Sequence, residues 1–219
     1  MLFAVILTIG ATVASCKDYL DVVPDNTATI DHAFRNRHEA EKFLYGCFSF
    51  LPNHADPASN PALLGGDEVW YIDPANIVSP ILWNIAKGNQ GTNSPYANYW
   101  ASQQDGYDLR GGKALFTALS DCNIFLDNIY KPKDLDDYER DWWIAEVTFL
   151  KAFYHFYLFR MYGPIPLIRE NLPISASSDE VRRYREPVDD VVNYIVELLD
   201  ASIENLPMEI LDVTSDLGR

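Results

Sequence analysis

Apolar residues recur at intervals of three and four in four stretches of the chain, and this spacing predicts four amphipathic helices. In the first of them, Asn36 can cap the helix with Glu39 as its reciprocal partner. In the last, Pro187 stands in the first turn, where a missing N–H costs nothing. The three outer helices are expected between Asn36 and Pro52, between Gly112 and Pro132, and between Pro187 and Pro207.

The fourth predicted helix runs from Trp142 to Tyr162, and we expect the other helices to pack around it. Thr148, Lys151 and His155 share one narrow stripe at about 100° per residue, which leaves most of the circumference to apolar and aromatic side chains. The charged residues inside this stretch argue against a membrane span, because each is expensive in hydrocarbon. Gly163 can turn left-handed at the helix end, after which the chain leaves as an extended segment.

Residues 53–112 show neither a sustained helical period nor an alternating one. Irregular segments of this length usually carry function, are disordered or pack as a subdomain. Disorder is disfavoured here, because the segment holds three of the five tryptophans of the chain. The pattern therefore predicts an all-α fold, an antiparallel helix stack with a long irregular, aromatic-rich insertion.

The beginning of the chain has the pattern of an export signal, with an apolar run that is too short to span a membrane as a helix. The tetrapeptide Val13-Ala14-Ser15-Cys16 fits the bacterial lipoprotein processing box, in which the cysteine becomes the lipidated first residue. We therefore expect a signal peptide at residues 1–15, a tether at 16–30 and a helical domain at 31–219.

Composition and motifs narrow the function classes. The chain has 32 Asp and Glu against 17 Lys and Arg, which disfavours nucleic acid as a partner. It contains no G-x-S-x-G, H-E-x-x-H, phosphate-binding glycine loop or dinucleotide fingerprint, and Asp67 with Glu68 is a pair that arises by chance in an acidic chain. We therefore expect a protein that is not an enzyme and that has no cofactor and no metal site.

The cysteines lack the C-x-x-C spacing of a zinc or redox site and are too few for a disulfide framework. Cys47 and Cys122 lie on the apolar stripes of two predicted helices. Two reduced, buried thiols are slightly favoured there, and a disulfide between the two residues stays open.

Three segments carry a resemblance to a known family. Residues 146–167 are similar to the pattern E-x-x-F-L-R-A-x-x-Y-F-x-L-x-R-x-Y-G-x-x-P-L, and residues 17–24 follow the pattern C-x-D-F-L-D-x-x-P from its second position. Residues 182–207 match R-x-x-R-E-P-V-D-x-V-x-x-x-I-x-x-L-L-x-A-I-x-x-L-P, with Ser202-Ile203 where the pattern has one isoleucine. All three patterns are those of SusD/RagB-type proteins, which are nutrient-binding lipoproteins on the outer membrane of Bacteroidota.

The resemblance implies a TPR-like helix stack and a surface glycan-binding lipoprotein. Such a protein captures oligosaccharides outside the cell and delivers them to a TonB-dependent, SusC-like transporter in the outer membrane. Two alternatives remain: a peptide-binding, RagB-like component of a peptide importer, and a helical scaffold without a small ligand. Proteins of this family are more than twice as long, so we expect this chain to be an N-terminal portion that is truncated before the C-terminal part.

A glycan site needs flat aromatic platforms beside amide and acid partners, and the insertion supplies both. Because a large loop also needs rings to attach it to the helices, we expect only some of these side chains to touch ligand. The candidate glycan contacts are Asp67, Trp70, Trp83, Asn84, Tyr96 and Trp100.

Overall fold

The computed structural model describes residues 29–52, 55, 61, 65–66, 70, 80–93, 95–100 and 114–208. The predicted signal peptide, most of the tether and the lipidation site Cys16 lie outside these residues. No strand occurs in the described ranges. Their helices are α2 (Ile30–Ala33), α3 (Arg37–Phe48), α5 (Pro80–Ala86), α6 (Leu115–Asn128), α7 (Asp137–Tyr162), α8 (Ser178–Val181) and α9 (Val188–Ile203).

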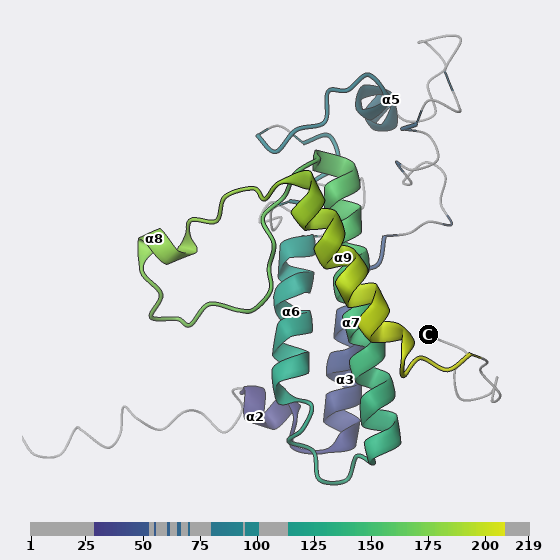
Figure 1. Cartoon of the computed structure of the whole chain (residues 1–219), viewed down its shortest axis with the longest axis vertical. Coiled ribbons are helices and arrows are strands. Elements are labelled where there is room, and N and C mark those ends of the chain that lie inside the picture. The colour runs from purple at the N-terminus through teal and green to yellow at the C-terminus, as the bar shows by residue number, and fades with distance from the viewer. Residues whose placement is uncertain are drawn as a thin grey trace, which may run out of the picture.

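The helices α3, α6 and α7 form a bundle, and α9 packs against α7 along its length (Figure 1). The short connection after α6 turns the chain back, so that α6 and α7 are antiparallel, and α9 is antiparallel to α7 in the same way (Figure 1). These are the four helices that the apolar spacing predicts. The all-α class and the antiparallel stack are therefore confirmed.

The long helix α7 is the centre of the core, as predicted. Its Trp143, Tyr154 and Tyr157 are fully buried, and the Tyr154 hydroxyl donates to the Cys47 carbonyl oxygen at 2.6 Å. Cys47 and Cys122 are both buried and free, in agreement with the favoured prediction. A buried hydroxyl that donates to a buried carbonyl satisfies both groups, so α7 is fixed to the C-terminal end of α3.

The beginnings of α3 and α7 are joined by polar contacts. Asn36 caps α3 by accepting from the Glu39 N–H at 3.0 Å, and Asp136 caps α7 in the same way. Arg37 Nε donates to Glu139 Oε2 at 2.6 Å, and the guanidinium lies 5.3 Å from the centre of the Trp143 ring. The hydrogen bond to Glu139 is the main cause of a raised pKa at Arg37. These contacts keep the two helices in register at this end of the bundle.

At its other end α7 stops at Gly163, which has a φ of 71° and whose N–H donates to the Phe159 carbonyl at 2.8 Å. A positive φ is available to glycine at little cost, so the predicted helix end is confirmed. The chain then turns back along α7 as the return segment, residues 165–171.

The return segment covers the polar stripe of α7, so that Lys151 and His155 are buried. Lys151 Nζ donates to the Arg169 carbonyl at 2.7 Å, and His155 Nε2 accepts from the Ile168 N–H at 3.3 Å. Burial lowers the pKa of Lys151 and also lowers that of His155, to about 4. Two polar side chains of α7 therefore satisfy one carbonyl and one N–H of the extended return segment.

The insertion contains a helix that the sequence pattern did not predict. Helix α5 spans only seven residues, which is too short for an apolar period to be recognisable. The expectation that 53–112 lacks helix is wrong at this point. None of the helices in the described part of the chain combines the length and the hydrophobicity that a membrane span requires.

Candidate ligand-binding site

Residues 89–100 of the insertion are held on the C-terminal end of α7 by one hydroxyl. The Tyr162 hydroxyl donates to the Ala97 carbonyl at 3.1 Å and accepts from the Tyr99 N–H at 3.0 Å. Gln90 fixes the same loop from inside, since its side chain donates to the Ala97 carbonyl at 2.7 Å and accepts from the Tyr96 N–H at 2.9 Å. Burial raises the pKa of Tyr162, so the hydroxyl stays protonated at neutral pH and keeps donating.

Trp100 lies where the insertion, α6 and α7 meet. Its ring is half-buried and makes edge contacts with Phe116 at 4.9 Å and with Tyr162 at 5.2 Å between ring centres. The guanidinium of Arg185 lies 5.3 Å from the centre of the same ring, and its Nη1 donates to the Tyr162 carbonyl at 3.3 Å. Trp100 is thus a fixed platform with a cation beside it.

A pocket of about 380 Å³ opens at Tyr162 and Arg185, and Trp100 is not among the residues that line it. Its lining combines side-chain amides, hydroxyls and one guanidinium, which can donate and accept hydrogen bonds without an acidic group. Such a set suits the hydroxyl rim of a sugar. The lining residues are Asn89, Gln90, Gly91, Thr92, Asn93, Tyr162 and Arg185.

Arg185 is the site residue that the sequence did not reveal. It is one of three arginines shortly before Pro187, and the fold brings it to the insertion. The Glu186 N–H donates to the Ile165 carbonyl at 3.0 Å, which places the neighbouring Arg185 against Tyr162. No local pattern encodes this, because the contact depends on how a loop of about twenty residues closes on itself.

Two of the predicted glycan contacts lie together, Trp83 on α5 and Trp70 from the segment before it. The rings of Trp70 and Trp83 are 4.7 Å apart at an angle of 52°, and Trp70 is 56% exposed. Lys87 Nζ lies 5.5 Å from the centre of the Trp83 ring. One exposed ring and one half-buried ring therefore lie together beside a cation. Their part in glycan binding stays a prediction.

Two other predicted contacts have structural roles. Asn84 donates to the Pro80 carbonyl at 2.7 Å and accepts from the Asn89 amide at 3.2 Å, so it closes the end of α5. Tyr96 uses its N–H to hold Gln90, and its ring is half-buried. Asn84 therefore holds the side chain of Asn89, and Asn89 lines the pocket of about 380 Å³. Asp67 lies outside the described residues.

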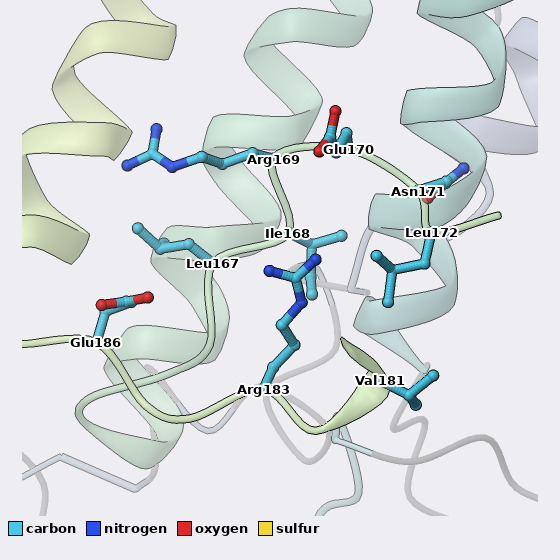
Figure 2. A pocket seen from close by; sticks show the side chains of 9 residues that line it. All are labelled: Leu167, Ile168, Arg169, Glu170, Asn171, Leu172, Val181, Arg183 and Glu186. Carbon is cyan, nitrogen blue, oxygen red and sulfur yellow. The ribbon is translucent and has the colours of Figure 1, made fainter. Parts of the chain in front are cut away.

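A second pocket, of about 310 Å³, lies between the return segment and the loop that carries α8 (Figure 2). Figure 2 shows Arg183 reaching from the loop toward the return segment. The lining mixes arginines, carboxylates and aliphatic side chains but includes no aromatic ring, so it offers no platform for a sugar. This pocket is the weaker candidate for a glycan.

A third pocket lies at the opposite end of α7. It measures about 210 Å³ and is lined in part by Trp142, Tyr138 and Asn205. It also has aromatic and amide groups, but it is smaller, and Asp141 and Glu204 make it acidic. A substitution in this pocket is therefore a suitable control for one in the pocket of about 380 Å³. Among the described residues, no three His, Cys, Asp or Glu side chains gather as metal ligands would.

Comparison with known proteins identifies a family. A SusD-like family model described as "Starch-binding associating with outer membrane" matches residues 69–215. A SusD-like protein of Formosa agariphila is 23% identical over 174 residues, which cover 76% of this chain and 32% of that protein.

Solved structures agree in fold. A SusD-like protein from Bacteroides fragilis matches with a TM-score of 0.60 and 16% identity, over 88% of this chain and 34% of that one. A laminarin binding SusD-like protein matches with a TM-score of 0.57 and 19% identity, over 82% of this chain and 36% of the other. The chain spans about a third of the length of each of these relatives.

Proposed function

Because the chain belongs to the SusD-like family, we propose that it is part of a glycan-binding lipoprotein of the outer membrane. In this role it captures oligosaccharides at the cell surface and delivers them to a SusC-like, TonB-dependent transporter. Lipidation of Cys16 would anchor the protein, with its binding surface facing the exterior. The family description as starch-binding supports a carbohydrate ligand.

The observation that carries this proposal is the pocket of about 380 Å³ between the insertion, Tyr162 and Arg185. The side chains of Thr92, Asn93 and Arg185 can pair with several sugar hydroxyls. The ring of Trp100 lies against Arg185 and helps to hold its guanidinium at this pocket. The name of the laminarin binding relative supports a glucan as the first ligand to try. The pocket supplies binding groups without an acid and base pair, so we propose binding without hydrolysis.

The pair Trp70 and Trp83 is proposed as a second contact for a longer glycan. Each ring of such a pair can stack on one sugar unit of an oligosaccharide. A long glycan could therefore contact both this pair and the pocket of about 380 Å³. Asp67, Asn84 and Tyr96 stay proposed members of this surface, with Asn84 acting by positioning Asn89.

Affinity electrophoresis tests the proposal. The chain is run through gels that contain laminarin, starch or no polysaccharide, and binding to a peptide pool is measured separately. We expect retardation by at least one polysaccharide and no product formation. Peptide binding without glycan binding would favour a peptide importer, retention by neither ligand would favour a scaffold, and released sugar would identify an enzyme; each of these contradicts the proposal.

A matched pair of variants locates the site. Asn93→Ala removes an exposed amide from the proposed pocket, and Asn205→Ala removes one from the smaller acidic pocket. We expect Asn93→Ala to weaken glycan binding about threefold to tenfold, the usual worth of one neutral hydrogen bond. Asn205→Ala is expected to bind as the unaltered chain does. The reverse result would move the site to the other end of α7.

A further inference from the structure

The pocket of about 380 Å³ has a charge opposite to that of the chain as a whole. The chain carries 32 Asp and Glu against 17 Lys and Arg. The lining of this pocket nevertheless contains no carboxylate and one cation, Arg185. Its other polar side chains are neutral amides and hydroxyls. The pocket is therefore locally positive in a chain whose net charge is −15.

The guanidinium of Arg185 forms no ion pair with any carboxylate of the described part of the chain. Five other arginines in that part each have a carboxylate oxygen at 3.9 Å or less, and they are Arg35, Arg37, Arg140, Arg169 and Arg182. The charge of Arg185 is thus not neutralised by a neighbour, so an anionic ligand would not have to displace an internal partner.

The contacts that hold Arg185 leave most of its donors free. Its Nη1 donates to the Tyr162 carbonyl at 3.3 Å, and the guanidinium lies 5.3 Å from the centre of the Trp100 ring. Its side chain makes no further hydrogen bond within the described residues. A guanidinium has five N–H donors, so four of them remain for a ligand. Because Trp100 and Tyr162 already position the group, binding costs less side-chain freedom.

The pocket between the return segment and the loop that carries α8 has a different balance of charge. Figure 2 shows Arg169 and Arg183 on its border together with Glu170 and Glu186. An anion in this second pocket would therefore meet carboxylates as well as guanidinium groups. Arg183 provides a comparison for Arg185, because it is exposed and close in sequence but lies in a pocket of mixed charge.

We propose that the pocket at Arg185 binds a glycan with an acidic sugar unit, whose carboxylate pairs with the guanidinium. The planar fork of N–H donors matches the two oxygens of a carboxylate, and such charge-assisted hydrogen bonds are about twice as strong as neutral ones. Thr92 and Asn93 can bind hydroxyls of the same sugar. This inference rests on the proposed function, because it narrows the ligand from glycans in general to those that contain a uronic acid.

Calorimetric titration with matched oligosaccharides tests the inference. The probes are short oligosaccharides of galacturonic acid and of mannuronic acid, and the same compounds after reduction of each carboxyl group to an alcohol. Laminarin oligosaccharides are the neutral reference. At about 0.15 M salt the Debye length is about 8 Å, so the distant carboxylates of the chain are largely screened. The proteins are the unaltered chain, Arg185→Gln, and Arg183→Gln as the control from the second pocket.

We expect at least one acidic oligosaccharide to bind at least about tenfold more tightly than its reduced counterpart. Arg185→Gln should weaken the acidic form more than the reduced form and bring this ratio to within about twofold, whereas Arg183→Gln should preserve the ratio.

Two results would overturn the inference and leave the proposed glycan-binding function intact. One is a preference for the acidic form that Arg185→Gln does not change. The other is binding of laminarin oligosaccharides when neither acidic oligosaccharide binds. Failure of every glycan to bind would instead contradict the proposed function itself, and the inference with it.

Discussion

The two sides of α7 reverse the usual distribution of polarity. On one side Lys151 and His155 are buried against the return segment, while on another Phe149 and Phe156 are about two-fifths exposed. The difference shows that a side chain on this helix is buried where another segment packs against it, whether the side chain is polar or apolar. An extended segment needs hydrogen-bond partners, which Lys151 and His155 supply, whereas the phenylalanines face a surface that no described element covers.

The largest expected effect is the loss of stability when the buried His155 is protonated. His155 has a pKa of about 4 in the folded chain, against about 6.5 when unfolded. Protonation therefore favours the unfolded chain, so stability is complete above about pH 6.5 and falls as the pH drops toward 4. The shift corresponds to about 3 kcal/mol as an upper limit. Urea unfolding across this pH range measures the loss.

Two variants separate the titration of His155 from that of carboxylates in the same pH range. One such carboxylate is Asp121, because burial raises its pKa. His155→Gln cannot gain a charge, so its unfolding free energy should fall less steeply with decreasing pH than that of the unaltered chain. His38→Gln, at an exposed position, should retain the original slope. Parallel slopes for all three proteins would show that His155 is not the sensitive group.

A smaller loss is expected from Lys151→Ala. The substitution removes the donor to the Arg169 carbonyl and leaves space beside the return segment. We expect the free energy of unfolding to fall by about 2 kcal/mol, since a buried acceptor loses its partner. Lys133→Ala, at an exposed site, should lie within about 0.5 kcal/mol of the unaltered chain in the same denaturant experiment. Equal effects would mean that the buried hydrogen bond contributes nothing.

The smallest effect belongs to the exposed side. Phe156→Ser removes a ring that is 42% exposed and that the Arg160 guanidinium approaches at 5.7 Å from its centre. Because the ring is only partly buried and its removal leaves no enclosed cavity, we expect a loss of about 1 kcal/mol by thermal or urea unfolding, smaller than that of Lys151→Ala. A loss as large as that of Lys151→Ala would erase the difference between the two sides.

The sequence predicts most of the fold because the helices depend on local signals. The spacing of apolar residues, the cap Asn36 and the stop at Gly163 act within one or two turns. Helix α7 begins at Asp137, before the predicted start at Trp142, because its first turn is polar and its cap Asp136 was not recognised. Helix α5 escaped prediction because seven residues hold too little periodicity. The burial of Lys151 depends on the position of the return segment, which no local pattern specifies.

The candidate site could be predicted only in part, for the same reason. Aromatic residues of the insertion were recognisable by type, and Trp70, Trp83 and Trp100 do offer rings at or near the surface. The partners of Trp100 come from elsewhere in the chain: Tyr162 from the end of α7 and Arg185 from the loop before α9. These residues come together only in the tertiary fold, so the sequence alone does not show which ring has polar partners.

The most direct test of the account is the contribution of Arg185 to glycan binding. Arg185→Gln removes the cation beside Trp100, and Arg182→Gln removes an equal charge from an exposed position three residues earlier. With a polysaccharide that retards the unaltered chain, we predict at least about tenfold weaker binding by Arg185→Gln, or about 1.4 kcal/mol. Arg182→Gln should bind normally. Unchanged binding by Arg185→Gln would contradict the assignment of the pocket as the glycan site.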